Sequence, residues 1–240
     1  MSSQANELSL DAVKKLLDSG DFDQFVGKIE GDYFEAKQQR PYKIDSSDSN
    51  ERFSARVELS GDIASVANAK GGYVVCGLTT EKETDLQTDI VKKINLFDKA
   101  SFYTQEIIQE VVNTHIVPEL KIVTTWYPSK TGKTKGLGAI YIPRQVESKK
   151  HFLVTAVEVN GAKQKHFVSI PIRQGSEPIW MSAKQIYRHA ASKKPNELKQ
   201  IHDSLTGQIE ELRGILLTGK GIASPADDLP RKIKEVLDVH

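Results

Sequence analysis

The chain has a single cysteine and no long hydrophobic run. Cys76 has no second cysteine with which to form an internal disulfide, so nothing in the sequence calls for an oxidising compartment. No apolar stretch approaches the roughly 18 residues of a membrane helix, and the first residues lack the charged and then apolar order of a secretory signal. We therefore expect a protein that is neither exported nor membrane-spanning, with the cytoplasm as its simplest location.

The sequence also has few of the residue motifs that are typical of common catalytic sites. The six histidines show no close metal-ligand spacing, and Cys76 lies in an apolar run typical of a core strand, which argues against a zinc site or a thiol catalyst. The Gly-Lys-Thr at 132–134 is not a P-loop, because Tyr127 stands where that motif needs its upstream glycine. These absences leave binding through surface charge as the class to consider first.

Positive charge is concentrated in one part of the chain. Residues 129–194 hold thirteen Lys and Arg against three Glu, a balance of +10, so the remainder of a chain with net charge +1 carries −9. Such a block is expected on a face that binds a polyanion, provided that its side chains share one side of the fold. The alternative is a set of solvated hairpins that use lysine for solubility and edge protection.

Hydrophobic periodicity predicts a mixture of helices and strands. Helices are expected after Ser9, over 51–69, around 86–97 and 102–114, and after Ser182. Strands are expected over 32–38, 73–78, 120–127 and 137–143, and in a hairpin around Asn160-Gly161. This order predicts an α+β fold in which helices pack on a mixed or antiparallel sheet.

The stretch "SKKPN" at 192–196 has the composition of a linker. We therefore predict a first domain over residues 1–192 and a C-terminal helical appendage over 193–240. Between 196 and 217, large aliphatic residues at helical spacing form a stripe that can dock on the domain or pair with a second copy of the chain. A homodimer through 196–217 is thus one expectation.

The glycine pair at 71–72 lies between an expected helix and an expected strand. A phosphate-binding glycine loop leads into a helix N-terminus, whereas these glycines follow a helix, where the nearby dipole end is negative. We predict that Gly71 ends the helix in a left-handed conformation and that Gly72 permits a close backbone approach.

Four pieces, in order, resemble the Schlafen-type, AlbA-like family of nucleic-acid-binding domains. They are Glu35-Ala36-Lys37 in a strand, a helix that ends in Ala67-Asn68, the pair Gly71-Gly72 before an apolar strand, and a distal segment with Arg173, Gly175 and Ser176. The resemblance covers roughly residues 8–191. Two departures are the alanine at 36, where the family has phenylalanine, and a longer polar loop before the helix.

Some members of that family are metal-dependent ribonucleases, and the resemblance implies where their acidic site would fall. Glu30 and Glu35 match two of its acidic positions, and the third falls on Thr80, with Glu81 beside it. Glu30, Glu35 and Glu81 would then hold Mg²⁺ or Mn²⁺, with Glu30, Glu35 and Lys37 as the catalytic set and Lys37 near the scissile phosphate. The alternative is that Glu35 and Lys37 form a solvated or cross-strand pair and Glu30 sits in a turn.

Charge and resemblance together predict a protein that binds RNA or DNA through phosphates. The expected contacts are the basic side chains Lys130, Lys133, Lys135, Lys149, Lys150, Lys163, Lys165 and Arg173. One alternative is a metal-dependent endoribonuclease that uses Glu30 and Glu35, and whether the chain is an enzyme at all stays open at this point. The other is an oligomerising interaction module that pairs through 196–217.

Overall fold

The computed structural model describes residues 7–38, 42–83, 88–160, 163–174, 177–182, 184–188 and 206–207. The chain divides into two compact units, Met1–Ile186 and Tyr187–His240, and nearly all described residues belong to the first. The predicted boundary at 192, the appendage over 193–240 and the stripe over 196–217 lie outside the described residues, apart from residues 206–207. They stay predictions.

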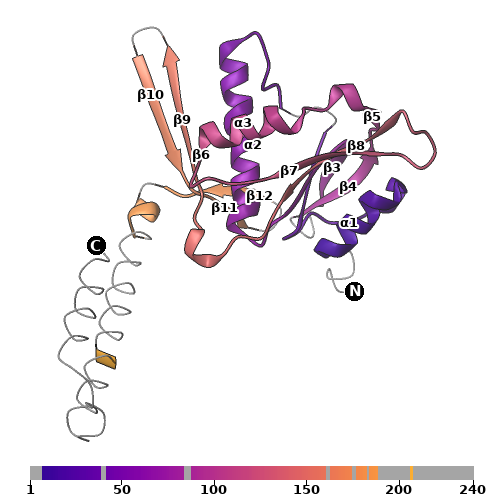
Figure 1. Ribbon diagram of the computed structural model, residues 1–240, viewed down its shortest axis with the longest axis horizontal. Helices are drawn as coiled ribbons and strands as arrows, with labels where there is room; N and C mark the ends of the chain where they lie inside the picture. The colour runs from indigo at the N-terminus through magenta and orange to yellow at the C-terminus, as the bar shows by residue number, and fades with distance from the viewer. Residues whose placement is uncertain are drawn as a thin grey trace, which may run out of the picture. The chain divides into compact units, whose positions relative to one another are not determined.

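The first unit combines helices and strands along its whole length (Figure 1). Its α-helices are α1 (Leu10–Ser19), α2 (Ser49–Asn68) and α3 (Gln105–His115), and its 3₁₀ turns are η2 (Phe22–Phe25), η3 (Lys99–Ser101) and η4 (Glu147–Lys149). The strands are β1 (Phe34–Lys37), β2 (Gly72–Cys76), β3 (Leu78–Glu83), β4 (Thr88–Ile94), β5 (Phe97–Asp98), β6 (Ile116–Val117), β7 (Val123–Pro128), β8 (Lys135–Ile142), β9 (Leu153–Asn160), β10 (Lys163–Ser169), β11 (Pro171–Gln174) and β12 (Glu177–Trp180). None of the described helices is long and apolar enough to cross a membrane.

The central sheet is mixed, which confirms the predicted α+β class. Its order is β1-β2-β8-β5, and β7 also pairs with β8. β1 runs parallel to β2, with Glu35 opposite Val74, and the other pairs are antiparallel. Every residue of β2 is buried, as its β-branched run predicts for a central strand.

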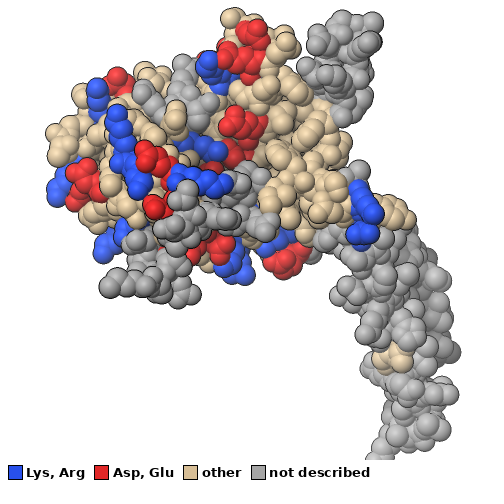
Figure 2. Space-filling view, turned by 180° about the vertical axis from the view of Figure 1, so that it is seen from behind, with Lys and Arg blue, Asp and Glu red and all other residues tan. Residues whose placement is uncertain are grey.

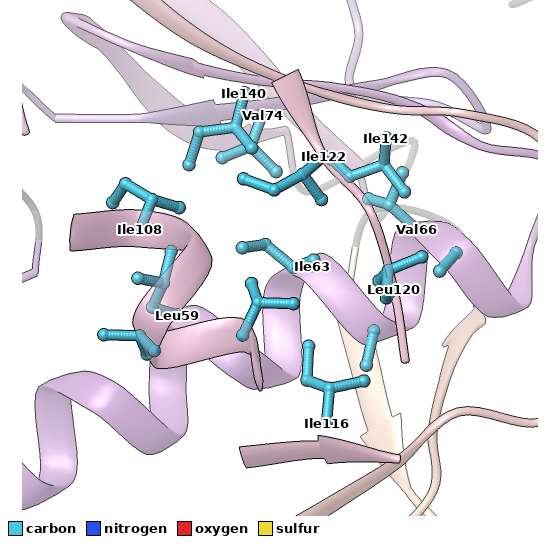
Figure 3. Packing of buried hydrophobic residues seen from close by; sticks show 14 of the residues in the cluster. Leu59, Ile63, Val66, Val74, Ile108, Ile116, Leu120, Ile122, Ile140 and Ile142 are labelled. Atoms are coloured by element: carbon cyan, nitrogen blue, oxygen red, sulfur yellow. The ribbon is translucent and has the colours of Figure 1, made fainter. Parts of the chain in front are cut away.

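Helices cover both faces of this sheet. In β2, Val74 belongs to the core formed with α2 and α3 (Figure 3), whereas its neighbours Tyr73 and Val75 belong to the core formed with α1 and η2. This division follows from the alternation of side chains along a strand. Any polar side chain on the inner strands therefore lies under a helix.

α2 covers the face of the sheet to which Val74 points. Asp48 caps its N-terminus, because its carboxylate accepts a hydrogen bond from the Glu51 N–H at 2.8 Å. From Leu59 to Ala67 every residue is buried, so this half of the helix is enclosed on all sides. Small residues make this possible: a Cβ on Gly61 would lie 2.6 Å from the ring of Trp180 in β12.

The helix predicted around 86–97 is wrong. β4 occupies much of that range and pairs antiparallel with β3, with Val91 opposite Thr80. The backbone of Val91 also exchanges hydrogen bonds with Gly27 and Lys28, so β4 is held from both sides. Its β-branched residues suit this pairing, and tertiary contacts have overridden the helical spacing of the aliphatic residues.

The glycine pair behaves as predicted. Gly71 has φ 75°, and a Cβ there would lie 2.6 Å from the Arg144 backbone nitrogen. Gly72 has φ 154°, and its Cβ would lie 2.5 Å from the Tyr33 carbonyl oxygen. The pair turns the chain from α2 into β2 and brings β1 close.

Asn68, the last residue of α2, connects three elements. Its Nδ2 donates to the carbonyl oxygens of Phe152 at 3.0 Å and Pro171 at 2.8 Å, and its Oδ1 accepts from the Phe152 N–H at 2.7 Å. The side chain thus ties the end of α2 to the entrance of β9 and to β11. Asn68, of the Ala67-Asn68 motif, therefore stabilises the fold by joining these three elements.

We expect Asn68→Ala to lower the free energy of unfolding by about 2 to 4 kcal/mol, because three hydrogen bonds are lost and their backbone partners stay partly buried. Urea denaturation measures the loss. Asn113→Ala is the control: it removes an exposed side chain that bonds only Gln109 in the described contacts, and should change stability by less than about 0.5 kcal/mol. Equal losses for the two variants would contradict the assignment.

Candidate functional site

Strand alternation places the two charged residues of β1 on the side of α2. Phe34 and Ala36 belong to the core under α1 and η2, so Glu35 and Lys37 point to the opposite face of the sheet. Glu35 is only 4% exposed, although it carries an ionisable group. A carboxyl group in such a place needs partners, because an unpaired buried charge is strongly destabilising.

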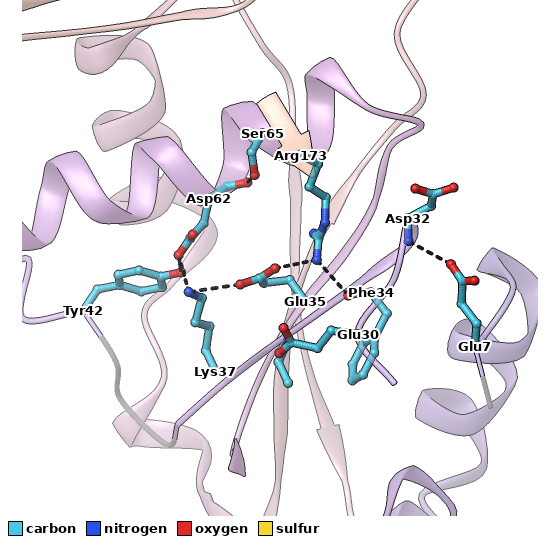
Figure 4. Close-up of polar contacts among 11 residues, drawn as sticks. Glu7, Glu30, Asp32, Phe34, Glu35, Lys37, Tyr42, Asp62, Ser65 and Arg173 are labelled. Atoms are coloured by element: carbon cyan, nitrogen blue, oxygen red, sulfur yellow. Dashed lines mark hydrogen bonds and ion pairs between the residues drawn. The ribbon is translucent and has the colours of Figure 1, made fainter. Parts of the chain in front are cut away.

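Lys37 is the first partner. Its Nζ lies 3.1 Å from Glu35 Oε1 and 2.8 Å from Asp62 Oδ2, so the ammonium bridges β1 and α2 (Figure 4). The Tyr42 hydroxyl donates to the same Asp62 carboxylate. Burial lowers the pKa of Lys37, but Asp62 and Glu35 together raise it above its ordinary value.

Arg173 is the second partner, and it comes from β11. Its Nη2 lies 2.7 Å from Glu35 Oε2 and donates to the Phe34 carbonyl oxygen at 3.3 Å. The Arg173 side chain is only 3% exposed. Glu35 therefore receives a cation on each of its oxygens. We name Glu35, Lys37, Asp62, Tyr42 and Arg173 the charge cluster.

Glu30 lies against the charge cluster but is bonded differently. Its Oε1 accepts a hydrogen bond from the Ala36 N–H at 2.8 Å, and the residue is 5% exposed. Burial, followed by the nearby Glu35, raises the pKa of Glu30 to about 9. Burial also raises the pKa of Glu35, against the opposing effects of Arg173 and Lys37. Near neutral pH, Glu30 holds a proton.

The residues proposed as metal ligands do not fit a metal site. Glu30 Oε1 accepts a hydrogen bond from the Ala36 N–H, and both oxygens of Glu35 face cations. Glu81 is exposed on β3, and within the ranges described no group of three His, Cys, Asp or Glu side chains is placed to hold a metal ion. A divalent cation needs several ionised oxygens at short distance.

A hollow lies beside Lys37. Its volume is about 330 Å³, and it is lined by Ala36, Lys37, Gln38, Glu58, Leu78 and Thr80. Burial and the neighbouring Asp62 raise the pKa of Glu58, and Lys37 acts in the opposite direction. The lining of the hollow therefore combines two apolar residues with a lysine, a glutamine, a glutamate and a threonine.

The basic side chains of 129–194 that the structure describes are either exposed or turned inward. Lys130, Lys133 and Lys135 are exposed at the turn between β7 and β8, and Lys149 is exposed in η4. Figure 2 shows Lys and Arg beside Asp and Glu on the face it displays, so charges of both signs share that face. The side chains of Lys163 and Lys165, in β10, lie outside the described part of the structure.

Two of the predicted phosphate contacts are turned inward. Arg173 is buried against Glu35, as described above. The Lys150 side chain is 10% exposed, and its Nζ bonds Glu147 and the Ala69 carbonyl oxygen, both at 2.7 Å. Each serves an internal contact in this structure, because a buried cation is most stable next to an anion or a carbonyl oxygen.

Sequence reasoning missed Asp62 and Tyr42. The signal for Asp62 was a carboxylate between Leu59 and Ile63 in a stretch of helix otherwise made of small and apolar residues. A charged residue in such a stretch indicates a buried partner. Tyr42 follows the residues 39–41, which the structure does not describe, and only its hydrogen bond to Asp62 reveals its part in the charge cluster.

Comparison with known proteins gives one family. The family model described as Schlafen, AlbA_2 matches residues 30–194, which include the whole charge cluster. None of the curated proteins compared with the chain matches it. Among solved structures, the N-terminal domain of a RecG-related protein from Nitrosomonas europaea is similar at 14% identity and a TM-score of 0.31. That likeness covers 64% of this chain and 87% of the other, and its TM-score is too low to support an argument.

The proton on Glu30 predicts how stability depends on pH. A carboxyl group whose pKa rises on folding, here from 4.5 to about 9, stabilises the fold at low pH and loses that contribution as the pH rises through the folded value. Glu30→Gln keeps an oxygen acceptor for the Ala36 N–H and cannot ionise. In the wild type, the free energy of unfolding should fall as the pH rises toward about 9. We expect Glu30→Gln to reduce the slope of that fall by up to about 1.4 kcal/mol per pH unit. Urea denaturation between about pH 6 and pH 9 measures the slopes, and parallel curves for wild type and variant would contradict the prediction.

Proposed function

We propose that this chain, which belongs to the Schlafen AlbA_2 family, binds nucleic acid. The observation that carries the proposal is the family match over residues 30–194, which includes the segment with a charge balance of +10. The phosphates of a nucleic acid are attracted to such a segment, whatever the base sequence of the nucleic acid.

The turn between β7 and β8 is the best-supported phosphate contact. Lys130, Lys133 and Lys135 lie within six residues of one another and are exposed. The turn is held in place, because the Lys130 N–H donates to the Gly20 carbonyl oxygen at 2.9 Å and the Ser129 N–H donates to that of Lys135 at 2.8 Å. A fixed backbone with long cationic side chains suits a ligand whose charges recur along a strand.

Metal-dependent cleavage of RNA receives no support from the geometry. The carboxyl groups of Glu30 and Glu35 are engaged by the Ala36 N–H and by two cations, respectively. A cleavage step through them would first require both arrangements to be undone. Nuclease activity with Mg²⁺ or Mn²⁺ thus rests on the resemblance alone. The interaction module formed by 196–217 stays a prediction from the helical spacing of its aliphatic residues.

Binding through phosphates predicts a steep dependence on salt. We expect the affinity for a hairpin RNA or a DNA duplex to fall by orders of magnitude between about 50 and 200 mM salt, with a slope set by the number of phosphates contacted. Replacing Lys130, Lys133 and Lys135 with alanine should reduce that slope by about one for each lysine that contacts a phosphate. Fluorescence anisotropy at several salt concentrations measures the slope.

The matched control replaces three exposed lysines outside 129–194, namely Lys93, Lys99 and Lys121, with alanine. It removes the same charge and should leave the slope nearer to the wild-type value. An equal effect of the two triple variants would reject the β7–β8 turn as the contact. A flat salt response, or no binding at low salt, would reject nucleic-acid binding through phosphates.

The paired state of the carboxyl groups predicts that the chain does not cleave RNA. A labelled structured RNA is incubated with Mg²⁺ or Mn²⁺ and with either the wild type or Glu30→Gln. We expect both proteins to give no more fragments than the RNA incubated without protein. Gel electrophoresis resolves the products. Discrete fragments that appear with wild type and disappear with Glu30→Gln would contradict this expectation and restore the nuclease hypothesis.

A further inference from the structure

The helix α1 ends at a glycine that is bonded to the β7–β8 turn. Gly20 is buried and has φ 66°, and its N–H donates to the Leu17 carbonyl oxygen at 3.2 Å, as is common at the C-terminus of a helix. Its own carbonyl oxygen accepts the Lys130 N–H at 2.9 Å. The end of α1 is therefore joined to a turn that comes much later in the chain.

The backbone packing at this joint leaves no room for a side chain. A Cβ on Gly20 would lie 2.8 Å from the Pro128 carbonyl oxygen and 2.9 Å from the Lys130 nitrogen. Both neighbours are backbone atoms, which cannot rotate away as the end of a side chain can. The left-handed φ is a second reason for glycine, because a Cβ crowds the following carbonyl oxygen in that conformation. Another residue at position 20 therefore has to push the β7–β8 turn away from α1.

The turn is held separately on each of its two sides. On the β8 side, Asp98 of β5 lies opposite Lys135 in an antiparallel pair. On the β7 side, the described backbone bond that reaches another element is the one from Lys130 to Gly20. The Ser129 N–H donates to the Lys135 carbonyl oxygen at 2.8 Å, which closes the hairpin itself. Loss of the Gly20 contact would therefore release Lys130 and leave Lys135 in place.

We propose that Gly20 is a positioning residue for nucleic-acid binding, which fixes Lys130 so that it contacts a phosphate together with Lys133 and Lys135. This rests on the proposed function, in which the three exposed lysines meet phosphates. Gly20 acts only through the backbone of Lys130. A fixed backbone lowers the entropy that is lost when long side chains become ordered on a ligand. Releasing it weakens binding although no charge is removed.

The test compares Gly20→Ala with Gly27→Ala, neither of which changes the charge of the protein. Gly27 is the matched control, because it has φ 80° and a Cβ there would point into open space. Its N–H bonds the Val91 carbonyl oxygen in β4, not the β7–β8 turn. Both variants place alanine in a left-handed conformation, but only Gly20→Ala displaces Lys130.

The affinity for a hairpin RNA and its salt dependence are the measured quantities. We expect Gly20→Ala to lower the affinity about three- to ten-fold at about 50 mM salt and to reduce the salt slope by about one, as the loss of one phosphate contact requires. Gly27→Ala should keep both close to the wild-type values. Fluorescence anisotropy at several salt concentrations gives both quantities for each variant.

Double variants decide whether Gly20 acts through Lys130. A positioning role predicts that Gly20→Ala has little further effect on affinity once Lys130 is replaced with alanine. The same substitution should add its full effect to that of Lys135→Ala, because β5 holds Lys135 independently. A purely structural role would give equal losses in the wild type and in both lysine variants.

Urea denaturation checks that each variant is folded under the conditions of the binding assay. Gly20→Asn replaces Gly20→Ala if the alanine variant does not fold. Asparagine adopts a left-handed φ more readily than alanine does, and it still brings a Cβ against the turn. The same loss of affinity and slope is expected from it.

Failure of the positioning role can be told apart from failure of nucleic-acid binding. Salt-dependent binding that Gly20→Ala leaves unchanged, or equal losses for Gly20→Ala and Gly27→Ala, would overturn only the positioning role. Additive effects of Gly20→Ala and Lys130→Ala would overturn it as well. If the wild type binds no RNA even at low salt, the proposed function is rejected, and the positioning role with it.

Discussion

Glu35 is a buried carboxyl group held between two cations, and the arrangement of β1, α2 and β11 depends on that contact. Lys37 reaches it from the same strand, and Arg173 reaches it from β11. Removing one partner of a buried ion pair costs more than the pair contributes, because the remaining charge is left in an apolar surrounding. The contact therefore ties β11 to β1: Arg173 Nη2 lies beside Glu35 and donates to the Phe34 carbonyl oxygen, while β11 also lies against α2.

Local rules were enough to predict much of this fold. The alternation in 32–38, the β-branched run after the glycine pair and the helix that ends at Asn68 each follow from short-range patterns, and all three are present. The segment 88–94 shows the limit of such rules. Its aliphatic residues suit a helix as well as a strand, and only the pairing with β3 and with the backbone near Gly27 decides for the strand.

The candidate site was less accessible to sequence reasoning for a physical reason. Glu30, Glu35 and Lys37 were identified through the family resemblance, but the pairing of Glu35 and Lys37 depends on Asp62 and Arg173, which come from distant segments. A carboxylate that faces water and one that faces an arginine look the same in a sequence. The position of Arg173 shows this most clearly, because a block of basic residues predicted a surface contact and one of its members lies in the interior.

The contact between Arg173 and the backbone of Phe34 joins residues 139 apart in the chain. During synthesis, β1 leaves the ribosome long before the residue that balances its carboxyl group exists, since chains are made at about 5 to 20 residues per second. β1 and α2 can collapse early around apolar contacts, yet their buried acid has only Lys37 beside it until β11 is made. The strand β11 thus completes the charge balance of the fold as well as its hydrogen bonding. In a nascent chain that ends before β11, Glu35 has only one of its two cations, and its burial is unfavourable.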